Sequence, residues 1–359
     1  AIPSYYLRYF YAERDVLAHR DVCSRAPIYQ RYDGVVRGCT AIPPGFADAG
    51  VLVPIPGAPL GVALGLGGNP RYGKIDATRA GQLAVMEAIA QVTCVGATPV
   101  GLTDCLNFGD PTIPAHMGAF VAAVDGLADA ARSLGVPFVS GNVSLYNRSA
   151  SGNHVAPSPI VSCVGTIDDV ANVVTGGLKE AGSHLMLLGA RDMTLAGSVL
   201  ADLIGLKSTT LPQANYEQFS ACCSVVRDAL ARGVVLSVHD VSDGGFLAAV
   251  AEMALMSSSR DQLGVVVDHP DLWYGVWLDK EVEYFSESWG FVVEVSDEEA
   301  FKRLAALRGV AGVTYRLGET TAEPVMRIRD VGHEDQTVAL TYLREAWEAP
   351  LRDFYGSVA

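Results

Sequence analysis

Short apolar segments alternate with segments of helical period along this chain, and this alternation constrains the fold more than any other feature. After Asp76, the apolar residues Leu83, Met86 and Ala90 recur at helical spacing, which predicts a helix with one buried face. Asp76 or Thr78 can cap the free amides at the start of this helix. Apolar strands separated by such helices favour an α/β (α+β) fold.

The first round of the alternation is assigned to an amino-terminal domain at residues 31–172. Its strands are predicted at residues 51–53, 62–64, 100–103, 136–139 and 160–167. A second helix is predicted to carry Phe120, Val124 and Leu127 on one face and to end at Gly135. Gly and Pro are frequent between residues 38 and 70, where they predict turns between short strands.

A second round begins with the apolar segment 184–189 and is assigned to a carboxy-terminal domain at residues 181–345. Its other strands are predicted at 234–238, 265–267, 290–295, 313–317 and 325–328, and its helices at 215–231, 246–256 and 297–307. The domain boundary is expected between Asp169 and Ala181. Residues 1–30, rich in Tyr, Arg and Asp, predict a short helical arm that lies on a surface rather than in a core.

Composition and charge restrict the class of partner. The chain has 359 residues, of which 50% are hydrophobic and 18% charged, so a packed globular protein with two domains is expected. The formal net charge of -14 would repel a nucleic-acid backbone or an anionic membrane, and neither is expected as a partner. Seven cysteines without a CxxC pair favour a reducing, cytoplasmic location. The absence of Met before Ala1 suggests processing or an excised fragment.

Polar residues follow two of the predicted strands, in the segments Thr103–Gly109 and Ser140–Asn147. Ligands of α/β sheets gather at the carboxyl ends of strands, so Asp104 and Asn142 are expected to share one edge. A carboxylate, an amide oxygen and a hydroxyl suit Mg²⁺ and nucleotide phosphates, and Gly141 would let the backbone approach a nucleotide closely. The alternative is that Asp and Asn merely close turns. Neither a Walker loop nor a GxGxxG fingerprint is present.

A third polar segment, Val238–Phe246, predicts a strand, a turn and a helix. His239 and Asp240 could form an acid–base pair. The structural interpretation is favoured, because Ser242 and Asp243 can satisfy the first amides of a helix that begins near Phe246. The segment Phe285–Trp289 is a further polar interruption whose role is ambiguous on its own.

Several of these segments together resemble a known enzyme family. The matching segments are Asn69–Tyr72, Val95–Pro99, Leu102–Gly109, Val139–Asn147, Pro157–Pro159, His239–Gly245 and Phe285–Ser288. In this order they are similar to the second half of phosphoribosylformylglycinamidine synthase in its small, separate-subunit form. The resemblance covers most of the chain from about Ser24 onward, and TDCLNFG with SGNVSLYN is a specific pair.

The resemblance implies the two-domain fold of the aminoimidazole-ribonucleotide synthase superfamily. In that fold a mixed-sheet amino-terminal domain pairs with another into a barrel-like pseudo-dimer, and an α/β carboxy-terminal domain follows. It further implies that Asp104 and Gly141 contact ATP, that Asn142 ligates Mg²⁺ and that Ser144 touches the substrate. The family reaction is the ATP-dependent amidation of formylglycinamide ribonucleotide in purine biosynthesis, which requires alignment and charge neutralisation more than covalent catalysis.

The chain also departs from the family pattern. The catalytic Ser-His-Asn-His motif of the first half is absent. Gly67-Gly68-Asn69 and Cys94-Val95 replace acidic metal ligands, and Trp289-Gly290-Phe291 replaces Pro-Gly-Arg. These differences predict a chain that is inactive alone and completes its site with an amino-terminal half.

The family implies further partners, namely a glutaminase subunit and a small bridging subunit. Two alternatives to an incomplete synthase are kept. The first is a free-standing homodimeric ATP-dependent kinase or synthase of the same superfamily, and the second is a non-catalytic scaffold. An Asp104→Asn change should separate catalysis from scaffolding.

Overall fold

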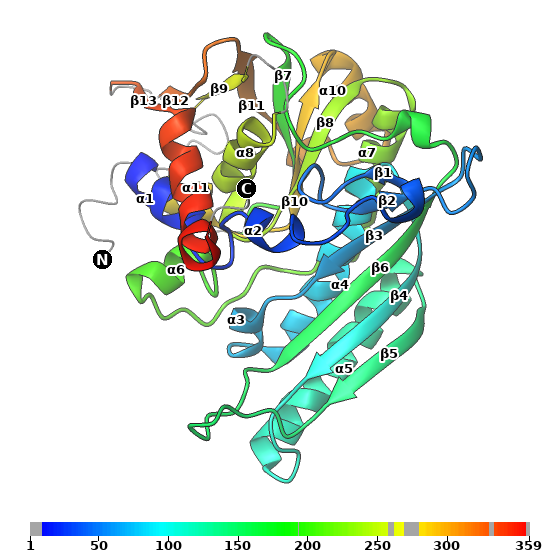
Figure 1. Ribbon diagram of the computed structural model, residues 1–359, viewed down its shortest axis with the longest axis vertical. Coiled ribbons are helices and arrows are strands. Elements are labelled where there is room, and N and C mark those ends of the chain that lie inside the picture. The colour runs from blue at the N-terminus through cyan, green and yellow to red at the C-terminus, as the bar shows by residue number, and fades with distance from the viewer. Residues whose placement is uncertain (1–8, 193, 258–261, 269–279, 330–333, 357–359) are drawn as a thin grey trace.

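The computed structural model describes residues 9–192, 194–257, 262–268, 280–329 and 334–356. Two mixed sheets, each with its own helices, form the molecule (Figure 1). None of the helices in these ranges combines the length and the apolar character that a membrane crossing requires.

The first sheet has six strands in the order β1-β2-β3-β6-β4-β5 (Figure 1). They are β1 (Thr40–Ile42), β2 (Gly50–Leu52), β3 (Gly61–Gly67), β4 (Thr98–Asn107), β5 (Phe138–Ser144) and β6 (Ser158–Ile167). Only β4 and β5 run parallel, and all other neighbours are antiparallel. The parallel pair places the two polar segments side by side, because Asp104 lies opposite Gly141.

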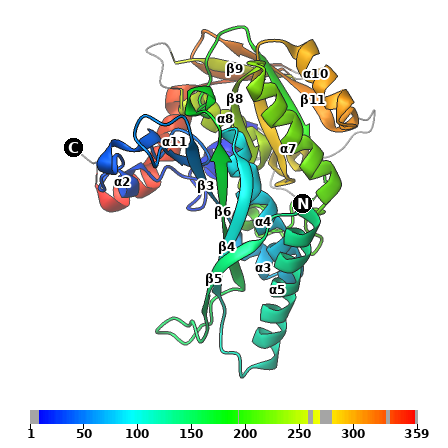
Figure 2. The same cartoon turned by 90° about the vertical axis from the view of Figure 1, so that its right-hand side faces the viewer.

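Two long helices, α4 (Ala77–Cys94) and α5 (Pro114–Leu134), lie on one side of this sheet (Figure 2). Helix α4 packs on β3 and β6, and α5 packs on α4. Glycine permits the close approach, since a Cβ on Gly65 would lie 2.8 Å from the carbonyl oxygen of Ala88. Asp76 caps α4 by accepting the N–H of Arg79, and Gly135 ends α5 with a φ of 70°, both as the sequence predicts.

The opposite side of the first sheet, called here the open sheet face, bears no helix among the described residues. Strand β3 alternates, so that Leu64 and Leu66 point to this face and are 44% and 60% exposed. Leu52 on β2 pairs with Val62 on the same face and is 38% exposed. The open sheet face is therefore an exposed apolar surface, and no closed barrel forms within the described part of the chain.

The second sheet has seven strands in the order β13-β12-β9-β11-β7-β10-β8. They are β7 (His184–Gly189), β8 (Val235–Val241), β9 (Gly264–Asp268), β10 (Gly290–Val295), β11 (Thr314–Thr321), β12 (Val325–Arg329) and β13 (Gln336–Ala339). Only β9 and β12 run parallel. Strand β10 is buried along its whole length and is apolar except for Glu294, which accepts hydrogen bonds from the hydroxyls of Ser183 and Ser237.

Helices cover both faces of the second sheet. Helices α7 (Tyr216–Ala231) and α10 (Glu298–Leu307) pack on one face, and α1 (Tyr9–Leu17), α8 (Gly245–Leu255) and α11 (Leu340–Tyr355) pack on the other. Alternate residues of β7 serve the two cores: Met186 contributes to the first and Leu187 to the second. The shorter helices are α2 (Ala26–Tyr29), α3 (Pro70–Gly73), α6 (Val199–Ile204) and α9 (Lys280–Phe285).

The amino-terminal arm is more buried than its sequence predicts. Ala12, Val16 and Leu17 on α1 are fully buried and belong to the core that α8 and α11 complete. The arm is therefore part of the second domain's packing rather than a strap on its surface.

Helix α4 belongs to both domains. It packs on the first sheet and also contacts α7, β8 and β10 of the second domain. Its residues Val85, Met86 and Ile89 join one continuous core with residues of α7 and β10. This part of the joint between the domains is thus an apolar interior.

The strand ends differ from those predicted at the two polar segments. Strand β4 runs on to Asn107 and β5 to Ser144, so Asp104 and Asn142 lie inside strands instead of just after them. Polar residues can occupy these strands because β5 is an edge strand with intermediate or exposed residues throughout. The elements that were not predicted include helices α6, α9 and α11 and strand β13.

Candidate functional site

Asp104 and Gly141 form a close pair across the parallel strands β4 and β5. A Cβ on Gly141 would lie 2.6 Å from Asp104 Oδ1, so the carboxyl group occupies the space over the glycine. Asp104 also accepts the backbone N–H of Asn142. Partial burial raises the pKa of Asp104, while that hydrogen bond opposes the rise.

Asn142 points to the other side of the sheet. Its Cα partner is Cys105, and its Nδ2 lies 4.0 Å from Cys105 Sγ as a weak donor. Asp104 pairs with the fully buried Val161 on the side of α4, so successive residues of β4 face opposite sides. The expectation that Asp104 and Asn142 meet at one edge is therefore correct for their backbones and wrong for their side chains. The cause is the strand extension, because side chains alternate within a strand.

Ser144 ends β5 on the same side as Asn142, the open sheet face. Its hydroxyl donates to Asn147 Oδ1 at 3.1 Å, and Asn147 Nδ2 donates to the Ser144 carbonyl oxygen at 2.8 Å. Tyr146 between them has a φ of 60° and is 59% exposed. The four predicted residues thus divide into two pairs, Asp104 with Gly141 and Asn142 with Ser144.

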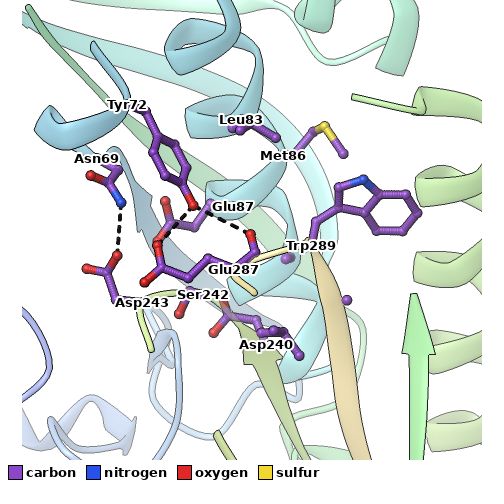
Figure 3. Close-up of a pocket in the computed structure, with 13 residues that line it drawn as sticks. Asn69, Tyr72, Leu83, Met86, Glu87, Asp240, Ser242, Asp243, Glu287 and Trp289 are labelled. Carbon is purple, nitrogen blue, oxygen red and sulfur yellow. Dashed lines mark hydrogen bonds between the residues drawn. The ribbon is translucent and has the colours of Figure 1, made fainter. Parts of the chain in front are cut away.

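A second polar cluster lies between the two domains, around a cavity of about 40 Å³ (Figure 3). We call it the acidic cavity. Its lining includes Asn69, Tyr72, Leu83, Met86, Glu87, Ala90, Asp240, Val241, Ser242, Asp243, Glu287, Trp289 and Gly290, and none of the four residues of the sheet site. A water needs roughly 10–15 Å³ of such space. The cavity can hold a few waters or one small ion, and a nucleotide does not fit.

Glu287 is the most connected acid of this cavity. Its Oε1 accepts the backbone N–H groups of Val199 and Gly244 at 2.7 and 2.8 Å. Its Oε2 accepts the Tyr72 hydroxyl at 3.0 Å (Figure 3). Burial, followed by the charge of Asp243, raises the pKa of Glu287 to about 8.

Two further acids, Asp240 and Glu87, line the cavity. Burial raises the pKa of Asp240 to about 6, and the charge of Asp48 acts in the same direction. Burial also raises the pKa of Glu87, whose Oε2 accepts the N–H of Gly68 at 2.8 Å. The pKa values of Glu287, Asp240 and Glu87 are therefore all raised above their ordinary values.

Asp243 does not cap helix α8 as the sequence predicts. The N-cap position is Gly244, without a side-chain cap, and Glu287 accepts its N–H instead. Asp243 Oδ1 accepts from Asn69 Nδ2 at 3.0 Å and from Arg71 Nη2 at 2.6 Å. The prediction failed because long-range partners, which local sequence does not reveal, satisfy both groups.

His239 is buried among three acids. Its Nδ1 lies 2.9 Å from Asp48 Oδ1 and 3.4 Å from Asp240 Oδ1, and its Nε2 lies 3.3 Å from Glu252 Oε2. Burial lowers the pKa of His239, but the charge of Asp48 and these hydrogen bonds outweigh it and leave the pKa raised. Asp48, His239 and Asp240 each offer a ligand atom within 4.8 Å of the others, which is the spacing of a metal site. The ion pairs of His239 with Asp48 and Glu252 support the structural interpretation of His239.

Sequence reasoning missed Arg71, Glu87 and Asp48 as cluster members. Glu87 carried the clearest signal, because it is the only acid within helix α4 and lies between the apolar residues Met86 and Ala88. The segment Phe285–Trp289 becomes clear in the structure. Ser286, Glu287 and Ser288 are buried and hydrogen-bonded, and Trp289 packs edge-on against Phe219 in the core.

Comparison with known proteins identifies both domains. Residues 46–167 match the family model of the AIR synthase related protein, N-terminal domain, and residues 180–331 match that of its C-terminal domain. The chain is 41% identical over 348 residues to phosphoribosylformylglycinamidine synthase subunit PurL of Methanothrix thermoacetophila, covering 94% of this chain and 44% of that protein. PurL of Deinococcus radiodurans is 35% identical over 353 residues, covering 95% of this chain and 46% of that protein. The chain thus spans less than half the length of these curated relatives.

Solved structures show the same fold. T. maritima PurL complexed with ATP matches with a TM-score of 0.68 and 18% identity, over 95% of this chain and 52% of that chain. T. maritima PurL complexed with FGAR matches with a TM-score of 0.69 and 19% identity, over 93% of this chain and 53% of that chain. A HypE–HypF complex matches with a TM-score of 0.58 and 15% identity, over 81% of this chain and 92% of that chain.

Proposed function

The chain belongs to the AIR synthase related family, and on that premise we propose that it is the carboxy-terminal half of a PurL-type phosphoribosylformylglycinamidine synthase. The observation that carries the proposal is the 41% identity to a PurL subunit over 94% of this chain. The activity is the ATP-dependent amidation of formylglycinamide ribonucleotide, a ligase reaction of purine biosynthesis that takes place in the cytoplasm.

In this proposal the sheet site carries the nucleotide and substrate contacts. Asp104 and the backbone at Gly141 bind ATP beside the edge strand β5, around which its phosphates reach the open sheet face, where Ser144 binds the substrate. Glycine supports the nucleotide role because, without a Cβ, it lets the backbone approach a phosphate once the Asp104 carboxyl group has moved aside. The chemistry transfers the γ-phosphoryl group of ATP to the formylglycinamide carbonyl oxygen with release of ADP. Ammonia then attacks the carbonyl carbon, and phosphate leaves.

The proposed Mg²⁺ ligand from this chain is Asn142. Its Nδ2 is directed towards Cys105 Sγ, which leaves Oδ1, a hard oxygen ligand suited to Mg²⁺, free of that contact. Magnesium would neutralise phosphate charge when bound. One side-chain oxygen does not complete such a site, so phosphate oxygens, waters and the companion half would supply the remaining ligands.

The open sheet face supports an incomplete site. Its leucines, exposed by up to 60%, are the surface on which a second sheet would close the predicted barrel-like pseudo-dimer. We infer that the amino-terminal half, in the same gene product or as a separate subunit, covers this face. A glutaminase subunit and a small bridging subunit would deliver ammonia to the assembled enzyme, and no nucleic acid or membrane is needed.

The test is ATP-dependent amidation with ammonia as the nitrogen source. The chain alone should be inactive, and addition of the amino-terminal half of a PurL subunit should restore turnover. Asp104→Asn should lower kcat/KM of the mixture by at least about tenfold, since one lost charge contact costs about 1.4 kcal/mol or more. Asp125→Asn, on the exposed side of α5, is the matched control. Turnover by the chain alone would contradict the proposal.

A free-standing homodimer is the second candidate. It is favoured by the HypE–HypF match, which covers 92% of that chain, whereas the PurL structures are covered by about half. In this case two copies of the chain would pair through their open sheet faces. Sedimentation of the chain alone distinguishes the candidates: a stable dimer that binds Mg-ATP supports the homodimer, and a monomer that associates only with the companion half supports the synthase. A companion half that works equally well with Asp104→Asn would support a scaffold.

A further inference from the structure

We propose that Arg71 is a built-in counter-cation that closes the acidic cavity to metal ions and clasps the amino-terminal arm to both domains. The inference concerns a cluster outside the sheet site and does not depend on the reaction proposed above.

The contacts of Arg71 come from three parts of the chain. Nη1 pairs with Asp21 of the arm, Nη2 lies 2.6 Å from Asp243 Oδ1, and Nε donates to the carbonyl oxygen of Gly197 at 2.8 Å. Nη2 is also 3.8 Å from Glu287 Oε2. The side chain is only 11% exposed. Every nitrogen of the planar guanidinium is thus used, which is how arginine binds several oxygen acceptors at once.

Local structure fixes the position of this side chain. Arg71 stands on the short helix α3, where Asn69 accepts the Arg71 N–H at 2.9 Å as N-cap. The next residue, Tyr72, is buried and donates to Glu287. Two consecutive residues of the first domain therefore hold acids of the second domain, and Asn69 holds Asp243 as well.

The charges around Arg71 resemble those of a cation site. The facing titratable groups are Asp21 and His19 from the arm, Tyr72 from α3, Glu87 from α4, Asp240 and Asp243 from β8 and the turn after it, and Glu287 after α9. Carboxylate oxygens converging from several elements are what a divalent cation requires. Here the guanidinium already lies against two of them, Asp243 and Glu287.

Two features disfavour the binding of a metal ion at the acids of the acidic cavity. The guanidinium lies against Asp243 and Glu287, although it does not itself line the cavity, and the Tyr72 hydroxyl and the N–H groups of Val199 and Gly244 already occupy both oxygens of Glu287. A second positive charge would have to displace the guanidinium or lie within a few ångströms of it, which is costly in a buried setting. Removal of the guanidinium should allow a metal ion to bind, because the buried carboxylates then lack their cation.

The experiment is a titration with Mn²⁺ alone, followed by electron paramagnetic resonance, on the full chain. Wild type and Glu287→Gln should bind the same amount of Mn²⁺, because the acidic cavity of the wild type takes none. Arg71→Ala should gain a Mn²⁺ site, with affinity at least roughly tenfold above any site of the wild type. That gain should disappear in Arg71→Ala/Glu287→Gln. Arg71→Ala should also have a lower Tm than wild type. Addition of Mn²⁺ should raise the Tm of Arg71→Ala more than it raises the Tm of the wild type.

The matched controls are Arg71→Lys, which keeps the positive charge and should stay closed to Mn²⁺, and Arg79→Ala on the exposed start of α4. The clasp itself is checked by limited proteolysis, in which Arg71→Ala should be cleaved faster than wild type between residues 17 and 25. Loss of wild-type Mn²⁺ binding in Glu287→Gln would overturn the proposal, and so would an Arg71→Ala variant that binds no more Mn²⁺ than wild type. The comparison of wild type with Glu287→Gln decides the matter even if Arg71→Ala does not fold.

Discussion

Gly141 and Asp104 share a space that has room for one side chain. Gly141→Ala would place a Cβ 2.6 Å from Asp104 Oδ1 and 2.9 Å from Asp104 Cγ. The carboxyl group is the end of a flexible side chain and can move aside, so we expect little change in stability together with weaker ATP binding. Urea denaturation and ATP titration of the assembled enzyme measure the two effects. Gly50→Ala on β2, where nothing lies within 4 Å, is the control that should change neither.

Glu287 makes stability depend on pH. Its pKa of about 8 in the folded chain exceeds that of an unfolded glutamate, so the folded state binds the extra proton. Stability is then greatest below the unfolded pKa and is lost as pH rises towards about 8. We expect the free energy of unfolding to fall by at least about 1 kcal/mol between pH 6 and pH 8, because one pKa unit corresponds to about 1.4 kcal/mol.

Glu287→Gln tests this, since an amide mimics the protonated acid and keeps an oxygen for the N–H groups of Val199 and Gly244. Chemical denaturation as a function of pH should show a flatter profile for the variant and higher stability than wild type at pH 8. Glu299→Gln, at a side chain that is 71% exposed, should leave the profile unchanged. A wild-type profile that rises between pH 6 and pH 8 would contradict the assignment.

At the scale of the elements, the contact between α4 and α5 depends on two glycines. A Cβ on Gly126 would overlap the carbonyl oxygen of Thr78, and one on Gly81 would lie 2.5 Å from the carbonyl oxygen of Ala123. Gly126→Ala should push the helices apart and lower the free energy of unfolding by about 1–3 kcal/mol. Gly118→Ala, in the same helix but with nothing within 4 Å, should instead be neutral or stabilising by about 0.5–1 kcal/mol. Urea denaturation of both variants measures the difference, and equal effects would exclude a close helix contact.

Sequence periodicity predicted the elements better than their ends. Helices α4, α5 and α7 were found because apolar residues recur at helical spacing and Asp76, Asn215 and Gly135 mark termini. The ends of β4 and β5 were missed because polar residues on an edge strand look like a loop. Because β5 extends past Asn142, side-chain alternation within the strand places Asn142 on the opposite side of the sheet from Asp104.

The acidic cavity illustrates what sequence alone does not supply. Arg71 meets Asp21, Asp243 and Glu287 across separations of 50 to more than 170 residues, which no local pattern encodes. The sheet site was partly predictable, because Asp104 and Gly141 stand in recognisable segments and do become neighbours. The fold followed from two rounds of strand and helix, whereas the burial of α1 required the tertiary contacts themselves.

For the whole molecule, the open sheet face is the surface that we propose for assembly. Leu66→Lys would place a charge on a side chain that is 60% exposed, so the isolated chain should keep its Tm. Association with the amino-terminal half should weaken by at least about tenfold, because a lysine would have to be buried in an apolar interface. Sedimentation of the mixture measures this. Leu307→Lys, 81% exposed on α10, is the control, and an equal effect of both changes would exclude the open sheet face as the interface.

Helix α4 has a consequence for movement during turnover. Because its residues share one apolar cluster with those of α7 and β10, a swing of the two domains away from each other would expose that cluster to water. Within the described residues, this contact opposes the hinge motion by which many nucleotide-dependent enzymes open and shut. Substrate entry and product exit should then depend on smaller movements at the surface of the molecule.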